Sequence, residues 1–242
     1  MGKEIFIAYV GGQYEERVKG LVTHFGEEGC KCTICKGDRV DGKERREKRA
    51  KILDIDRRLL DTIIADSHAK RKVPILKKTI ISIQQYIDSL ASTYPPKQQF
   101  RPDMSKAYHA LAEEYRLLGG EFIGKDYEAT ESAFKKANRA QLDSLIALGV
   151  KVLDDGSTAR RGCMIDFSCS SMESVHFVQE SGIAIAGTYD ILGDKKKAAA
   201  WTQTVLRCED LSSGGGKPFF RWLFMDQCRA FRFSDEMLAL MS

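Results

Sequence analysis

The sequence predicts a mainly α-helical protein, in which a short N-terminal strand and a cysteine-rich loop precede a helical bundle. Three observations lead to this prediction. Strand-forming branched and aromatic residues gather in residues 4–10. Three of the seven cysteines fall within residues 30–35. After residue 42, apolar residues recur at spacings of three and four, which is the period of an amphipathic helix. We therefore divide the 242 residues into an N-terminal segment, 1–41, and a helical domain, 42–242.

The N-terminal segment begins with the predicted strand, which ends at Gly11-Gly12. Residues 14–25 follow, with apolar side chains at helical spacing, and predict one helix before the cysteines. Beyond residue 42 almost no strand signal remains, although residues 163–167 are compatible with a short strand or the start of a helix. The helices predicted in the second domain span residues 43–69, 74–90, 104–118, 127–148, 172–192 and 195–211, with a last amphipathic helix within 219–241.

Local signals set the expected ends of these helices. Asp103 is a predicted N-cap, and Gly119-Gly120 is the predicted end of the helix that it starts. The basic run of residues 42–51 contains Glu44 and Glu47 between its arginines and lysines. Such mixed charge is typical of a solvated helix start, so we favour that interpretation over a nucleic-acid-binding arm.

A tight helical hairpin is expected near the C-terminus, because only Gly193-Asp194 separates helices 172–192 and 195–211. Small residues on the two helices predict a close crossing, as in tetratricopeptide-type helix pairs. No clean 34-residue repeat recurs, so the domain is predicted to be similar to such repeats rather than a regular array. The small residues are Gly182, Ala184, Ala186 and Gly187 on the first helix, and Ala198, Ala199 and Ala200 on the second.

Composition excludes some classes of protein. The chain is 43% hydrophobic and 30% charged, as in globular proteins, and no apolar run approaches the roughly 18 residues that span a bilayer. We expect no membrane association and no signal peptide, hence a reducing compartment, the nucleus or the cytoplasm. A net charge of +4 is small for this length and argues against nucleic-acid binding as the main activity.

The cysteine cluster, CKCTIC, predicts a zinc site. Cys32 and Cys35 form a Cys-x-x-Cys loop that places two thiolates on one tetrahedral ion, and Cys30 lies two residues earlier. Unligated reduced cysteines and redox chemistry are the alternatives; a redox pair usually follows a strand, whereas this one follows a glycine-bearing loop. The fourth ligand is not evident. His24 is expected to be a surface or cap residue, and the remaining cysteines, Cys163, Cys169, Cys208 and Cys228, are expected in the core.

No other catalytic motif stands out. His68, His109 and His176 lie singly on predicted helices, without a second ligand three or four residues away. The sequence Gly214-Gly215-Gly216-Lys217 lacks the preceding strand and following Ser or Thr of a phosphate-binding loop.

Taken together, GKEIFIAYV, EERVKGLVTHF and CKCTIC resemble one protein family. They are similar to the end of the SET domain and the post-SET segment of the SET- and MYND-domain protein-lysine methyltransferases and their fungal relatives. In that family a strand is followed by a helix with Glu-Glu-Arg, by Cys-x-Cys-x-x-Cys, and by a helical, tetratricopeptide-like C-terminal domain. The resemblance is specific over residues 1–40 and architectural beyond them.

The resemblance implies roles for individual residues. Tyr9 matches the active-site tyrosine beside the target-lysine channel, and Cys30, Cys32 and Cys35 match three post-SET zinc ligands, the fourth being a cysteine of the SET core. The family has an aromatic residue near the cofactor immediately before the first cysteine, where this chain has Gly29. Phe25 takes that role if the loop is shifted. The implied cofactor is S-adenosylmethionine, and the implied substrate is a lysine of a histone or another protein.

In this interpretation the SET strands, the Gly-x-Gly cofactor loop and the Asn-His-Ser-Cys-type motif precede residue 1. The chain is then the C-terminal portion of the enzyme, and we expect it to be inactive alone. An alternative from another class is a helical protein-interaction module that binds a partner peptide in a groove between its helices and retains a vestigial zinc loop. A free-standing zinc ribbon that binds nucleic acid is disfavoured, because a fourth ligand and a basic, aromatic-rich face are missing.

Overall fold

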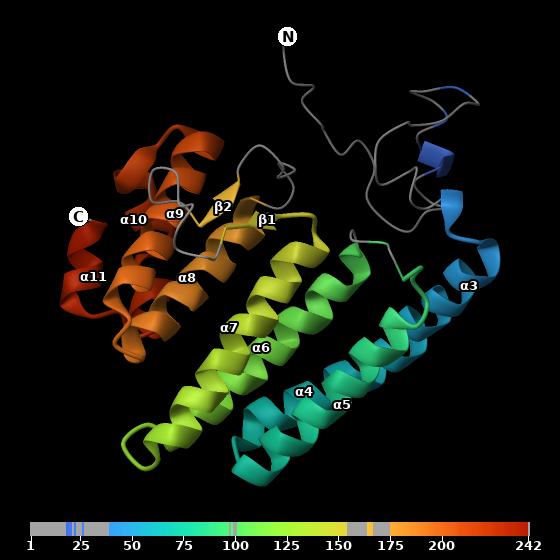
Figure 1. Ribbon diagram of the computed structural model, residues 1–242, viewed down its shortest axis with the longest axis horizontal. Coiled ribbons are helices and arrows are strands. Elements are labelled where there is room, and N and C mark those ends of the chain that lie inside the picture. The colour runs from blue at the N-terminus through green and yellow to red at the C-terminus, as the bar shows by residue number, and fades with distance from the viewer. Residues whose placement is uncertain are drawn as a thin grey trace.

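A computed structural model of the chain describes residues 18–20, 22, 26, 39–96, 98, 101–153, 164–166 and 175–241 (Figure 1). The regular secondary structure of this part is helical apart from two strands of two residues each, which confirms the predicted mainly α fold with a helical bundle. Residues 18–20 and 22 are helical, in agreement with the predicted helix 14–25. The predicted strand, residues 4–10, lies outside the described residues. None of the described helices has the length and apolar character needed to cross a membrane.

The first layer is a long helix and its antiparallel neighbour. Helix α3 (Lys43–Lys51), the π-helical turn η1 (Ile52–Asp56) and α4 (Arg57–Lys70) follow one another without a break. Arg71 adopts the left-handed conformation, with φ of 46°, and reverses the chain. Helix α5 (Val73–Ala91), with a proline in its first turn, then runs back along α4 (Figure 1).

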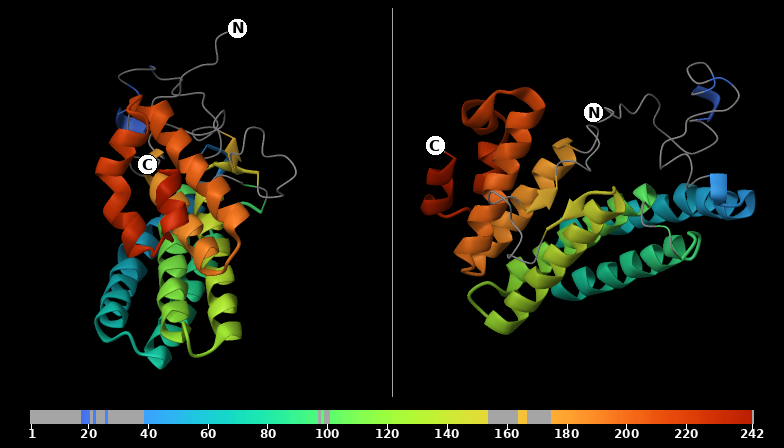
Figure 2. Two further views of the ribbon diagram at one scale, coloured as in Figure 1. Left: turned by 90° about the vertical axis from the view of Figure 1, so that its left-hand side faces the viewer. Right: turned by 45° about the horizontal axis from the view of Figure 1, so that its top comes forward.

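The second layer is the pair α6 (Pro102–Phe122) and α7 (Tyr127–Ala147), which lies between the α4–α5 pair and the C-terminal bundle (Figures 1 and 2). Two predictions about α6 were wrong. Asp103 is not its N-cap, because Arg101 takes that position and no side chain caps this end. The helix also continues through Gly119-Gly120, since Gly119 is a packing position where an added Cβ would lie 2.8 Å from the Phe134 ring.

The hairpin predicted near the C-terminus is formed by α8 (Val175–Ile191) and α9 (Lys195–Ser213). A Cβ at Gly182 would lie 2.4 Å from Cγ2 of Val205, so this glycine allows the close crossing. The small residues do not all serve that crossing, because a Cβ at Gly187 would instead meet Phe231 and Phe233 beyond the hairpin.

A minimal sheet and two short helices complete the bundle. Strands β1 (Lys151–Val152) and β2 (Ile165–Asp166) pair antiparallel, so the ambiguous segment 163–167 contributes a strand. Helices α10 (Gly216–Ala230) and α11 (Asp235–Leu240) pack back on α8 and α9, as the amphipathic tail predicts.

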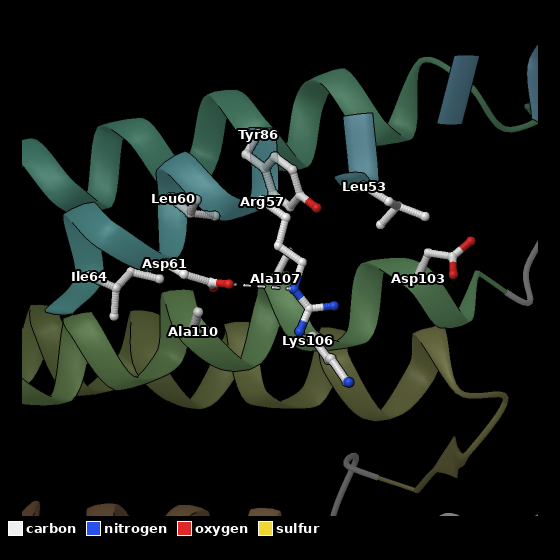
Figure 3. Close-up of a pocket in the computed structure, with 10 residues that line it drawn as sticks. All are labelled: Leu53, Arg57, Leu60, Asp61, Ile64, Tyr86, Asp103, Lys106, Ala107 and Ala110. Carbon is white, nitrogen blue, oxygen red and sulfur yellow. Dashed lines mark ion pairs between the residues drawn. The ribbon is translucent and has the colours of Figure 1, made fainter. Parts of the chain in front are cut away.

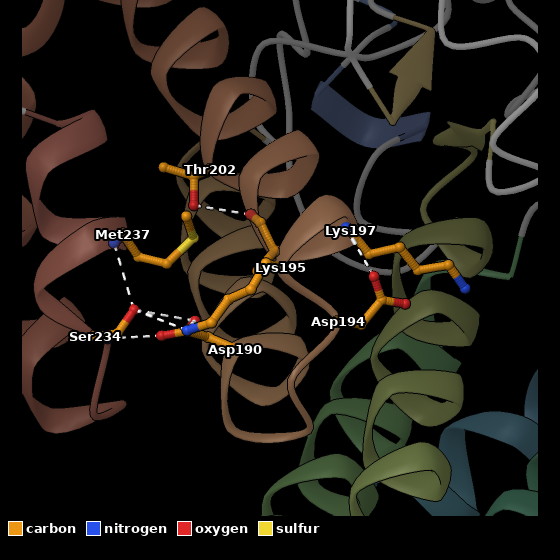
Figure 4. Close-up of polar contacts among 8 residues, drawn as sticks. Asp190, Asp194, Lys195, Lys197, Thr202, Ser234 and Met237 are labelled. Carbon is orange, nitrogen blue, oxygen red and sulfur yellow. Dashed lines mark hydrogen bonds and ion pairs between the residues drawn. The ribbon is translucent and has the colours of Figure 1, made fainter.

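A buried polar anchor holds α11 in place (Figure 4). The Asp190 carboxylate at the end of α8 accepts hydrogen bonds from the backbone N–H of Ser234, at 2.6 Å, and from its hydroxyl, at 3.1 Å. Lys195 Nζ lies 2.5 Å from the same carboxylate. Ser234 in turn caps α11 by accepting from the backbone N–H of Met237.

The buried apolar side chains form two separate clusters. The first lies between α4, α5 and α6, and the second lies inside the α8–α11 bundle. Helix α7 contributes Ala140 and Ala147 to the first cluster, and Leu142 and Leu145 to the second. Large members of the first cluster are Leu76, Ile83, Leu90 and Met104, and those of the second are Ile183, Ile185, Trp201, Phe220, Met237 and Met241.

Candidate functional site

The residues singled out from the sequence fall outside the described part of the chain. This holds for Tyr9, Phe25 and the cysteines Cys30, Cys32 and Cys35. It also holds for the other ligands weighed for the zinc site, His24, Cys163 and Cys169. The tyrosine, the cofactor residue and the zinc ligands therefore remain predictions. After the cysteines the structure describes the chain from residue 39 on, and it shows how that part is attached to the helical domain.

The attachment is a cluster of charged and aromatic residues, here called the junction: Asp41, Arg46, Arg49, Tyr94 and Asp103. Asp41 is fully buried and precedes α3 by two residues. Its carboxylate accepts a hydrogen bond from the Arg49 guanidinium, and its backbone carbonyl accepts one from Arg46. The chain six residues after Cys35 is thereby fixed against the first turns of α3.

Arg49 also connects α3 to the layer behind it. Its guanidinium lies 3.8 Å from the centroid of the Tyr94 ring, and its Nε lies 3.9 Å from the Asp103 carboxylate. The Tyr94 hydroxyl donates to Asp103 at 2.8 Å. Burial, reinforced by the charge of Asp103, raises the pKa of Tyr94 well above its usual value, so the phenol stays protonated. Each acidic group of the junction faces an arginine or a hydroxyl, which suits a structural clamp rather than acid–base chemistry.

Sequence reasoning missed the junction. The expectation of a solvated start to the helix at residue 43 was wrong for Arg49, which is only 5% exposed. A mixed-charge helix start gives no sign that one arginine will be buried, because the partners that bury it, Tyr94 and Asp103, lie about 50 residues away in the sequence.

A small pocket adjoins the junction and shares Asp103 with it (Figure 3). Its volume is about 90 Å³. That is room for several waters but far below the roughly 300 Å³ at which cofactor pockets begin. Arg57 and Asp61, one turn apart on α4, form an ion pair in its lining with Nε and Oδ2 3.8 Å apart, and burial raises the pKa of Tyr86 to about 12. The pocket therefore does not fit S-adenosylmethionine or a peptide. Its lining residues are Leu53, Arg57, Leu60, Asp61, Ile64, Tyr86, Asp103, Lys106, Ala107 and Ala110.

Histidines on the described helices lie beside acidic and polar side chains. His68 Nε2 lies 3.0 Å from Oε1 of the fully buried Glu114, whose other oxygen accepts from Ser67 at 2.9 Å. Desolvation raises the pKa of Glu114. The serine donates to the carboxylate and not to the histidine, so this trio lacks the order of a nucleophilic triad. Within the described ranges, no three His, Cys, Asp or Glu residues are grouped as metal ligands.

A second polar group, here called the seam, joins α6, α7 and α8. It consists of His109, Arg116, Gln141 and Ser181. The buried Gln141 amide lies 3.0 Å from His109 Nδ1 and donates to Ser181 at 2.8 Å, while its oxygen accepts from Arg116 at 3.0 Å. Burial lowers the pKa of Arg116 to about 10, and its guanidinium lies 5.6 Å from the centroid of the Phe231 ring. The polar groups of the seam pair with one another, and these contacts fix α6 and α7 against α8.

Two cysteines of the described chain are core residues, as predicted. Cys208 and Cys228 are buried, and burial raises the pKa of each thiol to about 12. Both thiols are therefore protonated at neutral pH.

Comparison with known proteins adds no relative: no family model, no curated protein and no solved structure matches the chain.

Proposed function

We propose that this chain is the C-terminal portion of a SET-type protein-lysine N-methyltransferase that uses S-adenosylmethionine, and that the chain is inactive by itself. The observation that carries the proposal is the order of features in residues 1–42: strand, Glu-Glu-Arg helix, Cys-x-Cys-x-x-Cys, and an immediate change to helices. The helical domain supports it, because α3 begins eight residues after Cys35 and the described residues from there on form only two strands, of two residues each.

In this proposal Cys30, Cys32 and Cys35 supply three thiolates to a structural zinc ion, and Tyr9 orients the target amine in the lysine channel. Phe25 contributes an aromatic wall to the cofactor site. The pocket beside the junction is too small for the cofactor, so the rest of that site is assigned to the SET core. The substrate is a lysine of a histone or another protein, encountered in the nucleus or cytoplasm.

The junction gives the helical domain a part in this scheme. Asp41 lies six residues after the last cysteine and is held by Arg46 and Arg49. A structural metal orders its loop most effectively when the ends of that loop are already fixed. The proposed role of the junction is therefore to present the cysteine loop from a fixed point at the edge of the helical bundle.

Zinc stoichiometry tests the metal part of the proposal. Purified chain 1–242 is titrated with zinc in the presence of a chromophoric chelator, beside the variants Cys32→Ser and Ser82→Ala, the second being a control at a half-buried position of α5. We expect zinc binding that Cys32→Ser weakens at least tenfold and that the control leaves unchanged. Zinc binding that does not depend on Cys32, or no zinc binding at all, would contradict it.

Two further observations test the enzyme part. Methyl transfer by the isolated chain to a histone or peptide substrate is expected to be undetectable, and measurable transfer would refute the predicted inactivity. The genomic reading frame upstream of the Met1 codon is expected to encode an Asn-His-Ser-Cys-type motif. A stop codon without such a motif would refute the assignment to a larger methyltransferase.

A second candidate is the helical protein-interaction module with a vestigial zinc loop. The observation that favours it is the exposed, apolar outer face of α10, where Trp222 is 77% exposed. The pocket among α4, α5 and α6 is too small for a peptide, so this candidate does not place the partner there.

A further inference from the structure

The first half of α5 and the turn before it carry only positive charge. Residues 67–87 include five lysines and arginines and no aspartate or glutamate. The whole chain has 38 basic and 34 acidic residues, so all the other residues together carry a net charge of −1. The net positive charge of the protein therefore arises from this segment. Its five basic residues are Lys70, Arg71, Lys72, Lys77 and Lys78.

Four residues of the segment form one exposed face of α5. Pro74, Lys77, Lys78 and Ile81 are spaced at three and four residues, so they lie on the same side of the helix. All four are exposed, and Ile81 is 58% exposed. The opposite side of α5 packs into the first core cluster. We call these four residues the α5 basic face; the turn that leads into it lies at the lower edge of the molecule in Figure 1.

No carboxylate neutralises the lysines of this face. Of the five basic residues, Lys70 pairs with Asp66 at 2.7 Å, and the other four form no ion pair within the part of the chain that the structure describes. The next carboxylate on this side of α5 is Asp88, seven residues beyond Ile81 and about 10 Å further along the helix axis. It accepts a hydrogen bond from Gln84. The face is therefore positively charged without internal compensation.

The position of the lysines opposes the helix that carries them. A helix N-terminus has a partial positive charge, which acidic side chains stabilise and basic ones destabilise. Helix α5 has no acidic residue in its first turn and no side-chain cap. Lys72 is its N-cap residue, and Lys77 and Lys78 lie in its second turn. These lysines make no favourable electrostatic contact in the described chain, and a negatively charged partner would supply one.

The make-up of the face favours a protein partner. An apolar centre with a polar rim is the anatomy of a protein interface, and here Pro74 and Ile81 lie between Lys77 and Lys78. Single-stranded nucleic acid stacks on exposed aromatic side chains, but the only aromatic residue within 67–87, Tyr86, is buried. Stable membrane attachment needs an apolar anchor beside a basic patch, and Ile81 is the only large apolar side chain exposed within 67–87.

We infer that the α5 basic face is a docking surface for an acidic segment of a partner protein, with apolar residues among its carboxylates. An apolar side chain of the partner covers Ile81, and carboxylates on either side pair with Lys77 and Lys78. A second copy of this chain is a poorer occupant, because a two-fold contact would place lysines against lysines. The inference does not rest on the methyltransferase assignment, since none of its residues belongs to the cysteine loop or the junction.

The probe is a fluorescein-labelled 16-residue peptide with Leu at every fourth position and Glu elsewhere. Its binding to the full chain is followed by anisotropy at low and high salt. Three other ligands distinguish the classes of partner: the same peptide with Gln in place of every Glu, a short DNA duplex, and phosphatidylserine vesicles. A peptide with Lys in place of every Glu serves for charge exchange.

We expect the Glu peptide to bind, and to bind more weakly as salt is added. Lys77→Ala/Lys78→Ala should weaken binding about tenfold, because each exposed ion pair contributes up to about fivefold. Ile81→Ala should weaken it about threefold. The matched control Lys135→Ala/Lys136→Ala removes another adjacent pair of exposed lysines, on α7, and should leave the affinity unchanged.

Two further measurements separate docking from folding. The Tm of Lys77→Ala/Lys78→Ala should not fall below that of the natural chain, because the start of α5 loses unfavourable positive charge. The charge-reversed variant Lys77→Glu/Lys78→Glu should bind the Lys peptide, which the natural chain should not bind. Far-UV circular dichroism of each variant establishes that the fold is intact.

Absence of binding by the Glu peptide, equal affinity of the Gln peptide, or an equal loss in the control variant would overturn the inference. Tighter binding to the duplex or to the vesicles would also overturn it and assign the face to nucleic acid or to a membrane. Self-association of the free chain that Lys77→Ala/Lys78→Ala abolishes would assign the face to a second copy instead. None of these results alters the zinc titration, so failure here and failure of the proposed function are distinguishable.

Discussion

Replacement of Gly182 by alanine should destabilise the protein, although alanine is the better helix former. Gly182 lies within α8, where it faces α9. An added Cβ would be 2.4 Å from Val205 Cγ2 and 3.5 Å from Trp201 Cε3. Val205 is 1% exposed and Trp201 is fully buried, so neither side chain has space to retreat. Valine in a helix is also nearly confined to one rotamer, so Val205 cannot relieve the contact by rotating its side chain.

The magnitude follows from two opposing terms. Glycine to alanine within a helix contributes about 1 kcal/mol of intrinsic stability. Forcing a methyl group into a packed core costs about 1–3 kcal/mol. A contact this short against a stiff neighbour places the cost near the upper end, so the net loss should be about 1–2 kcal/mol. For a chain of this size the Tm should then fall by roughly 3–6 °C.

Gly120 provides a matched control. It is helical, in α6, and an added Cβ would meet nothing within 4 Å. Gly120→Ala should therefore stabilise the protein by about 0.5–1 kcal/mol. Both variants are compared with the natural chain by urea and thermal unfolding, followed by far-UV circular dichroism. If Gly182→Ala proved as stable as Gly120→Ala, the close α8–α9 crossing would be wrong.

Three further predictions concern titration and reactivity. Desolvation raises the pKa of Glu114, so the free energy of unfolding should fall as pH rises from the ordinary glutamate pKa through the raised one. In urea titrations at pH 4–8, Glu114→Gln should make this fall smaller. An unchanged dependence of the free energy on pH would contradict the prediction. Burial opposes ionisation of Asp190, but its bonds to Lys195 and Ser234 prevail and lower its pKa. Asp190→Asn should therefore cost about 2 kcal/mol at pH 7 and less as pH falls through that lowered pKa, whereas a pH-independent loss would refute the role of the charge. Cys208 and Cys228 should resist iodoacetamide at pH 8 until the protein unfolds, and mass spectrometric detection of their rapid native-state alkylation would show that they are not buried as described.

Helix positions followed well from the sequence because they depend on local patterns. Apolar spacing predicted the ends of α5, α7 and α9 to within two residues. Helix α6 was harder. A Gly-Gly pair is a local stop signal, yet packing of Gly119 against Phe134 kept the pair inside the helix. Whether a helix continues through such a glycine depends on the residue that packs against the glycine in the folded chain. The local sequence does not show which residue that is.

The candidate site was predictable only where its residues form a contiguous motif. The cysteine cluster is visible in six letters, and its role remains a prediction because those residues lie outside the described chain. The junction and the seam unite residues from separate helices, as Arg49 meets Tyr94 and Gln141 meets Ser181. No local sequence signal pairs such distant positions. The exposed Trp222 was equally hidden, since apolar spacing on α10 does not tell which of its two apolar faces is covered.

The position of α7 between the two core clusters has a consequence for local opening. Its Ala140 and Ala147 belong to one cluster, and its Leu142 and Leu145 belong to the other. Opening of either cluster alone leaves one side of α7 packed, so its backbone amides exchange with deuterium only after both clusters open. Amides of α3, which buries only Arg49, should exchange first. A gradient of exchange rates would then run from the α3 end of the domain toward its centre, with α7 as the slowest element to exchange.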